Sequence, residues 1–437
     1  MVNADNVQRV LSKHLLADGM DIIVDLKASQ GSWLVDKRNG DRYLDCFSMF
    51  ASMAVGFNHP ELVKIADTLG QIAIQKPANS DIYTEPMAEF LETFSRIAMP
   101  NYLPHAFFIE GGALAVENCL KAAFDWKVKR NYAAGRDKVC GQQIIHFKQA
   151  FHGRSGYTLS LTNTSDPRKT QYFPGFDWPR IINPKCTFPL TAERLQQTIK
   201  LEQQAVLQIK EAISLHGPDI AGLIIEPIQG EGGDNHFRND FFVELRTLCD
   251  ENDILFILDE IQSGIGITGK FWAHEHTSIT PDLISFGKKT QVCGLLASSR
   301  LDEIKNNVFT ESSRINSTFG GNLIDMVRCS AILKIMEAEQ LVNNARDRGN
   351  QLLEGLEEIA QNYPAIVANA RGKGLMCSFD LTNASARDNF LAALLKEKLL
   401  LVGCGDNSIR FRPHLIITKD EIDIILNTIN KVITTLY

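Results

Sequence analysis

The chain has 437 residues, of which 44% are hydrophobic and 22% are charged, and its net charge at pH 7 is −7. A chain of this length and composition is typical of globular proteins with large cores rather than of disordered or fibrous ones, and length alone suggests about three domains. The acidic balance, without a basic stripe, argues against nucleic-acid binding. No apolar run is long enough for a membrane span or a signal peptide, and the nine cysteines include no C-x-x-C pair. We therefore expect a cytoplasmic protein with reduced thiols.

The first sixty residues predict a short amphipathic helix and then a β-hairpin. The stretch GSWLVDKRNGDRYLD has alternating apolar residues on both sides of Asn39-Gly40-Asp41, which is a good turn sequence. After Pro60, the stretch ELVKIADTLGQIAI has a helical period. Neither segment indicates any chemistry.

From about Ala106 short apolar runs alternate with amphipathic stretches, which predicts a mainly parallel sheet with helical crossovers. HAFFIEGGALAVENCLKAAFDWK predicts a strand, a Gly-Gly turn and a long helix. The N–H groups at such a helix start favour an anion. A Gly-Gly pair before a helix is also a common tight turn, so spacing alone leaves both interpretations open.

The next segment predicts two more strands. QQIIHF reads as a strand before FHGRSG, and AGLIIEP reads as a strand before a glycine-rich acidic loop. Between them, residues 166–189 predict a long loop and residues 191–216 an amphipathic helix. Asp234 and His236 lie in the acidic loop, but a specific metal site needs three or four ligands, so we expect no metal.

Two neighbouring strands are expected to bring an acid and an amine to one edge of the sheet. The run ILFILDE predicts a buried strand that ends at Asp259 and Glu260, and residues 281–287 predict another that ends before Lys288 and Lys289. Pyridoxal phosphate needs a lysine for its aldehyde and a carboxylate for its ring nitrogen. Taken singly, such residues are more often helix caps or surface charges.

Beyond residue 325 the sequence is helical through Asn362, and the remaining strands and helices predict a smaller α+β domain. Near its end, SIRFRPHLI contains Arg410 and Arg412.

The order DEIQSG, a glycine-containing loop and PDLISFGKKTQVCG resembles the class III aminotransferases, a branch of the fold type I pyridoxal-phosphate enzymes. The resemblance covers nearly the whole chain. It implies an α/β fold whose large cofactor-binding domain, residues 61–324, has a mainly parallel seven-stranded type of sheet. A small α+β domain, residues 325–437, would be joined by the N-terminal segment, residues 1–60.

The same resemblance assigns the catalytic roles. Lys288 would form the Schiff base with pyridoxal 5′-phosphate and then act as the base, and Asp259 would bind the ring nitrogen. The other cofactor contacts would be Gly112 and Ala113 at the phosphate, Phe151 on the ring with His152 beside it, Gln262 at the phenolic oxygen, and Thr318 at the phosphate of a neighbouring subunit. This implies a homodimer with shared sites. The family often has a hydroxyl residue beside the glycine, whereas this chain has EGGALAVEN, so backbone donors would matter more.

EPIQGEGGDNHFR, FGKKTQVCG and INSTFGGN most resemble the branch of the family that acts on L-lysine. The implied ping-pong reaction moves the ε-amino group of L-lysine to 2-oxoglutarate. It gives glutamate and 2-aminoadipate 6-semialdehyde, which cyclises to piperideine-6-carboxylate. Arg154 would bind the distant carboxylate of lysine and Arg410 the near carboxylate of glutamate, while Glu231 would cover Arg410 when lysine is bound. Asn316 is a further candidate for the substrate pocket.

Three alternatives stay open at this stage. Another ω-aminotransferase, acting on ornithine, 4-aminobutyrate or a diamine, would use the same machinery with a few different pocket contacts. An aminomutase or racemase would use the same cofactor without 2-oxoglutarate. A regulator that binds the cofactor as a ligand would need a DNA-binding element, and the sequence shows no such appendage.

Overall fold

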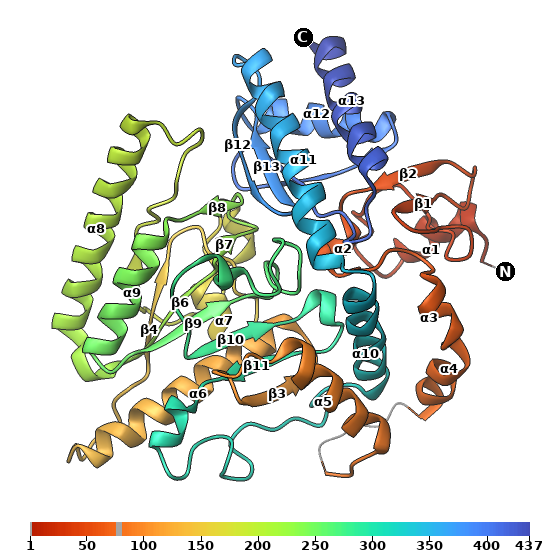
Figure 1. Cartoon of the computed structure of the whole chain (residues 1–437). Coiled ribbons are helices and arrows are strands. Elements are labelled where there is room, and N and C mark those ends of the chain that lie inside the picture. Colours follow the sequence, from red (N-terminus) through yellow and green to blue (C-terminus); the bar gives the residue numbers. More distant parts are fainter. Residues whose placement is uncertain (1, 76–80) are drawn as a thin grey trace.

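A seven-stranded sheet forms the middle of the molecule in this computed structural model, which describes residues 2–75 and 81–437 (Figure 1). The strands lie in the order β3, β11, β10, β9, β6, β4, β5. All neighbours pair in parallel except β11, which is antiparallel to both β10 and β3. Their bounds are β3 (His105–Ile109), β4 (Gln143–Phe147), β5 (Arg180–Ile181), β6 (Ile220–Ile225), β9 (Leu255–Asp259), β10 (Leu283–Phe286) and β11 (Cys293–Ala297). The predicted α/β architecture with a mainly parallel sheet is confirmed.

Side chains of the central strands alternate between two hydrophobic cores. On β9, Ile257 belongs to the core under α6 (Gly112–Ala133). Phe256 belongs to the opposite core, which α8 (Ala192–His216) and α9 (Asn239–Glu251) cover. Because both faces of the sheet are buried, its central strands are mostly apolar, as in the sequence LFILD of β9, which becomes polar only at its last residue.

The C-terminal part is built on a second sheet, which lies above the first in Figure 1. It is antiparallel, in the order β12, β13, β16, β15. Its strands are β12 (Ala368–Lys373), β13 (Met376–Asp380), β15 (Val402–Cys404) and β16 (Ser408–Arg410), and its helices are α11 (Leu341–Asn362), α12 (Ala384–Lys396) and α13 (Lys419–Leu436). The preceding helix α10 (Leu323–Ala338) is separated from α11 by Glu339 and Gln340, and the φ of Gln340 is +53°.

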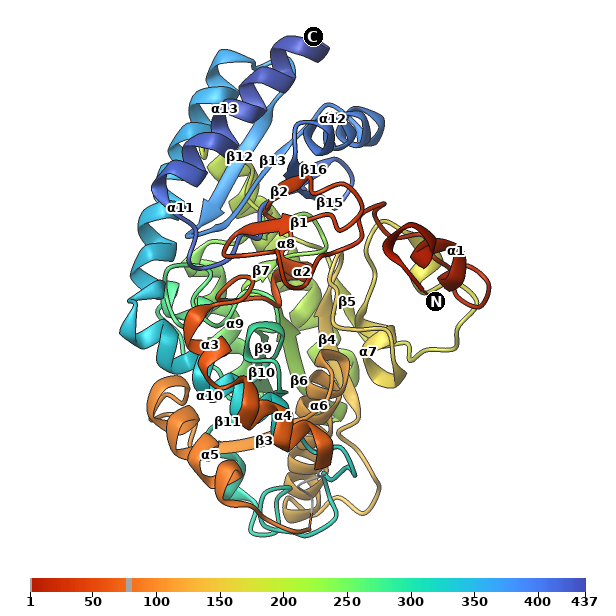
Figure 2. The same ribbon diagram turned by 90° about the vertical axis from the view of Figure 1, so that its right-hand side faces the viewer.

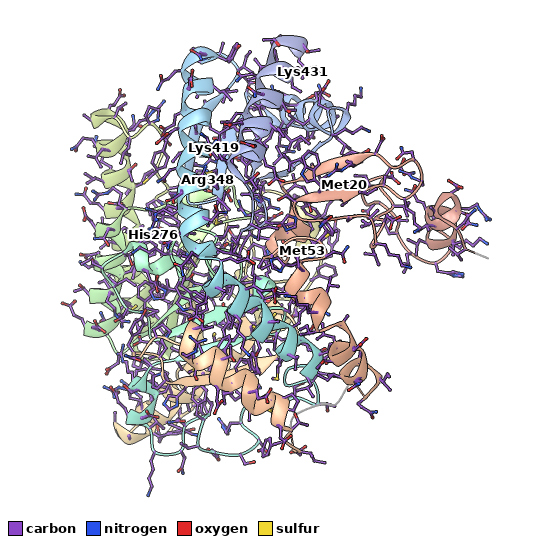
Figure 3. The ribbon with its side chains drawn as sticks, turned by 45° about the vertical axis from the view of Figure 1, so that its right-hand side comes forward. Met20, Met53, His276, Arg348, Lys419 and Lys431 are labelled. Carbon is purple, nitrogen blue, oxygen red and sulfur yellow. The ribbon has the colours of Figure 1, made fainter. Side chains whose placement is uncertain are left out.

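The N-terminal segment packs against this C-terminal part (Figure 2). The predicted hairpin is present as β1 (Trp33–Val35) and β2 (Arg42–Asp45), and β2 pairs in parallel with β14 (Leu399–Leu400). Met53, labelled in Figure 3, makes a second link, because its carbonyl oxygen lies 2.8 Å from Nδ1 of His414. Chain ends that are far apart in sequence are therefore joined in space.

The remaining α-helices are α1 (Val7–Leu11), α2 (Ser48–Ala51), α3 (Pro60–Lys64), α4 (Ala66–Gln75), α5 (Glu85–Ala98) and α7 (Gly156–Leu161). The helix predicted after Pro60 is interrupted at Ile65, between α3 and α4. The predicted loop 166–189 contains the edge strand β5, which the sequence pattern did not indicate. Within residues 2–75 and 81–437, every helix falls short of the length and apolar character of a membrane span.

Candidate active site

A cavity of about 530 Å³ opens at the carboxyl ends of the central strands. Asp259 is the last residue of β9, and Lys288 follows β10 after a single glycine. Both side chains lie on the cavity wall, which is also formed by residues from α6, from the segment after β4 and from the loop after β6. The lining residues are Ser52, Gly111, Gly112, Ala113, Phe151, His152, Gly153, Arg154, Glu226, Glu231, Asp259, Ile261, Gln262, Lys288, Gln291 and Cys293.

The carboxylate of Asp259 is fixed by three hydrogen-bonding groups. Its Oδ1 accepts from the Ser285 hydroxyl at 3.0 Å and from the Ile261 N–H at 3.1 Å. Its Oδ2 lies 2.7 Å from Nδ1 of His152, whose side chain is fully buried. Burial alone would lower the pKa of His152, but the hydrogen bond and charge of Asp259 outweigh it and raise that pKa. Asp259 is thus held in one orientation, beside a histidine whose raised pKa favours its protonated, positively charged form.

Glu226, directly after β6, is a buried acid that connects two loops of the cavity. One oxygen accepts the N–H of Phe151 and the other accepts the N–H of Gly230, each at 3.0 Å. Burial raises the pKa of Glu226 to about 7. Glu226 therefore positions the loop that carries Phe151 relative to the loop that carries Glu231.

Lys288 is held in a left-handed backbone conformation, with φ of +53°. Gly287 permits the close packing before it, because a Cβ there would lie 2.7 Å from Sγ of Cys293. Burial and the positive charges of Arg410 and Arg412 lower the pKa of Lys288 to about 8. The neutral amine, which can attack a carbonyl or accept a proton, is therefore accessible near neutral pH.

Lys289 and Glu260, the second members of the two charged pairs, have other partners. Lys289 is buried and donates to the carbonyl of Gln262 at 2.8 Å. Glu260 accepts the N–H groups of Ala273 and His274, at 2.6 and 2.9 Å. These bonds hold the polypeptide that surrounds the cavity, so both residues are structural.

The N-terminus of α6 lies at the cavity. Gly111, with φ of +98°, precedes the helix and has no side chain to bond its first N–H groups. A Cβ on Gly112 would lie 3.2 Å from the Ile261 side chain, so the backbone packs closely against the wall. The first N–H groups of a helix and the helix dipole favour an anion, so the structure supports the anion-binding interpretation that the spacing of the Gly-Gly pair left open.

Two buried arginines, Arg410 and Arg412, lie close enough to Lys288 to lower its pKa. Nη2 of Arg410 lies 2.8 Å from Oε2 of Glu231. Arg412 forms a two-bond ion pair with Asp234, in which Nη1 lies 2.9 Å from Oδ2, and its Nε donates to Oε1 of Gln262 at 2.9 Å. The carboxylate of Asp234 therefore binds an arginine side chain.

The structure brings most of the predicted site residues together. Nine of them line the cavity: Gly112, Ala113, Phe151, His152, Arg154, Glu231, Asp259, Gln262 and Lys288. Arg410 does not line the cavity itself, but it forms an ion pair with Glu231, which does. Asn316 and Thr318 do not line this cavity; both are exposed, and Asn316 lines a separate hollow with Phe108 and Gly320.

Sequence reasoning missed four residues that shape the site. In the sequence Glu226 is only the polar residue at the end of the strand AGLIIEP, and Ser285 lies inside an apolar strand, where its partner Asp259 comes from the neighbouring strand. Gln291 lies on the wall and donates to the carbonyl of Ser52 at 2.7 Å. Arg412 was the neighbour of the assigned Arg410, and only its ion pair with Asp234, 178 residues away, reveals its role.

Comparison with known proteins agrees with this geometry. The family model "Aminotransferase class-III" matches residues 16–433. The L-lysine-epsilon aminotransferase of Mycobacterium tuberculosis is 49% identical over 422 residues, which cover 96% of this chain and 93% of the relative. The enzyme of the same name from Streptomyces clavuligerus is 46% identical over 437 residues, with 99% and 95% coverage. A solved lysine aminotransferase from M. tuberculosis, in the internal aldimine form, superposes with a TM-score of 0.97 at 47% identity and covers 100% of both chains.

Proposed function

Because this chain belongs to the class III aminotransferase family, we propose that it moves the ε-amino group of L-lysine to 2-oxoglutarate. The products are glutamate and 2-aminoadipate 6-semialdehyde, which cyclises to piperideine-6-carboxylate. Relatives named L-lysine-epsilon aminotransferase, 46% and 49% identical over nearly the full length, support this substrate. The observation that carries the proposal is the Arg410–Glu231 ion pair beside Lys288, since it lets one cavity receive two different substrates.

Pyridoxal phosphate fits the residues of the cavity. An uncapped helix start, a fixed carboxylate and an amine of lowered pKa surround one space. The residues that would hold the cofactor are Lys288 at the aldehyde, Asp259 at the ring nitrogen, Gly112 and Ala113 at the phosphate, Phe151 and His152 at the ring, and Gln262 at the phenolic oxygen. When bound, the cofactor supplies a carbonyl for the substrate amine and a ring that withdraws electrons.

The chain's own residues then handle protons and charge. Lys288, with its pKa near 8, is able both to accept a proton from a substrate carbon and to return it. Asp259, oriented by Ser285 and the Ile261 N–H, would hold its carboxylate at the ring nitrogen of the bound cofactor. His152 keeps this carboxylate from turning away.

The two substrates would bind their carboxylates at two different cations. L-lysine presents its ε-amine to the reacting centre, so its carboxylate lies far away, where the exposed Arg154 on the cavity rim is able to bind it. Glutamate presents its α-amine, so its α-carboxylate needs a nearer cation, Arg410. Glu231 covers Arg410 in the first case and moves aside in the second.

A second copy of the chain completes the site in this proposal. Thr318 and Asn316 are exposed and lie away from the cavity of their own chain, so they are available to a neighbouring subunit. We assign residues 61–324 to the large cofactor-binding domain and residues 325–437 to the small domain, which the N-terminal segment, residues 1–60, joins. The nine free thiols support the cytoplasm as the location.

The test is to mix the pyridoxal-loaded protein with L-lysine alone, follow the cofactor's absorbance, and assay for the cyclic imine. Conversion to the pyridoxamine form with a six-membered imine supports the proposal. Conversion by ornithine or 4-aminobutyrate but not by L-lysine would show that the proposed substrate is wrong and the proposed mechanism is right. 4-Aminobutyrate is included because the human 4-aminobutyrate aminotransferase is 30% identical to this chain over 446 residues. Turnover without 2-oxoglutarate would indicate a mutase or racemase instead.

A further inference from the structure

Glu231 lies between two cations, of which only Arg410 belongs to the site described so far. Its Oε2 lies 2.8 Å from Nη2 of Arg410. Its Oε1 lies 2.6 Å from Nζ of Lys169, a residue of the short 3-10 helix Pro167–Lys169. Glu231 is thus bonded through both of its oxygens. Burial alone would raise its pKa, but the two cations outweigh burial and lower it.

The two cations differ in what else they are free to bind. The Arg410 side chain is 3% exposed, and its Nε and Nη1 have no hydrogen-bond partner among residues 2–75 and 81–437. Two of its three nitrogens are therefore unpaired within these residues, so Arg410 is able to bind a substrate carboxylate once Glu231 moves aside.

Lys169 is 21% exposed and is held in place independently of Glu231. Its Nζ lies 5.7 Å from the centre of the Phe151 ring and 3.4 Å from the Thr164 hydroxyl. Neither of these two contacts involves Glu231, so both are able to hold the ammonium group in place when Glu231 moves away from Arg410.

We infer that Lys169 determines substrate selection by holding Glu231 after a substrate carboxylate has displaced it from Arg410. The inference rests on the proposed function, in which Glu231 must leave Arg410 for glutamate and 2-oxoglutarate but not for L-lysine. Without Lys169, Glu231 would have no counter-charge after leaving Arg410, and a partly buried carboxylate without a counter-charge has a large desolvation cost. With Lys169 present, Glu231 exchanges two ion pairs for one and keeps its charge compensated.

Replacing Lys169 by methionine removes the charge and keeps the chain length. When 2-oxoglutarate binds and Glu231 leaves Arg410, Lys169 is the one counter-charge that Glu231 keeps. Lys169→Met should therefore raise the KM for 2-oxoglutarate by about fivefold to tenfold. The KM for L-lysine should change by less than about twofold, because Glu231 then stays on Arg410. Lys169 does not contact the reacting atoms in this account, so kcat should stay close to that of the unchanged protein.

Arg168→Met is the matched control. It removes one positive charge from the adjacent position, where the side chain is 81% exposed and pairs with Asp166 at 2.8 Å. A second readout avoids turnover: glutarate, a dicarboxylate without amine or carbonyl, is titrated into the pyridoxal-loaded protein by calorimetry. Its Kd should rise by the same factor in Lys169→Met, remain unchanged in Arg168→Met, and be insensitive to Lys169→Met when Glu231→Gln is also present.

Each outcome decides the matter. Equal increases in KM for both substrates would mean that Lys169 binds a substrate carboxylate directly, and this would overturn the inference. Unchanged KM and unchanged glutarate affinity would overturn it as well. If the unmodified protein does not use L-lysine, the proposed substrate is wrong, yet the glutarate titrations still test whether Lys169 assists the release of Arg410.

Discussion

The Arg412–Asp234 pair offers a test of how charge is balanced behind the cavity. Both side chains are buried, at 1% and 0% exposure, and they are joined by two bonds. Asp234→Asn removes the negative charge but preserves the shape, and asparagine tolerates the φ of +47° found at this position. An arginine left buried without a counter-charge costs about 3–5 kcal/mol, and the remaining amide–guanidinium bond places the expected loss near 3 kcal/mol.

The assay is urea unfolding of the cofactor-free protein, compared with that of Asp240→Asn. Asp240 lies six positions further along and is 71% exposed, with its ion-pair partner Arg238 2.9 Å away, so its loss should cost no more than about 1 kcal/mol. The double variant Asp234→Asn with Arg412→Met should recover most of the stability, because the unpaired charge is gone. Equal losses in the two single variants, or no recovery in the double one, would mean that Asp234 does not compensate a buried charge on Arg412.

Two further predictions concern catalysis. With the pKa of Lys288 at about 8, its neutral fraction rises with pH and reaches one half near pH 8, and about a tenth is neutral at pH 7. The rate at which the cofactor-free protein takes up pyridoxal phosphate should follow this curve in stopped-flow absorbance, and a midpoint near 10 would contradict it. Glu231→Ala exposes Arg410 permanently, so single-turnover absorbance should show the L-lysine half-reaction slowed by about tenfold and the glutamate half-reaction much less. Comparable slowing of both would argue against a gate at Arg410.

Features set by short stretches of sequence could be predicted. The apolar run before Asp259 predicts a strand buried on both faces, and such a strand must deliver its next polar residues to the carboxyl edge. The glycine pair before α6 predicts a helix start without a capping side chain. Both depend only on neighbours within a few residues.

Features that depend on pairing across the fold could not be predicted. β11 has the same apolar character as its neighbours, and only its sheet partners make it antiparallel. The separate partners of Lys288 and Lys289 could not be derived from the doublet itself, because they depend on where the loop after β9 runs. The contact of Lys169 with Glu231 joins the segment after β4 to the loop after β6, and no local pattern indicates it.

The most direct test of the account is to identify the lysine that carries the cofactor. The pyridoxal-loaded protein is reduced with borohydride, digested and mapped by mass spectrometry. Lys288 lines the cavity, whereas Lys289 is buried against the Gln262 carbonyl, so we expect the added mass on Lys288 alone and its loss in Lys288→Ala. Modification of Lys289, or of another lysine with Lys288 unmodified, would contradict the account.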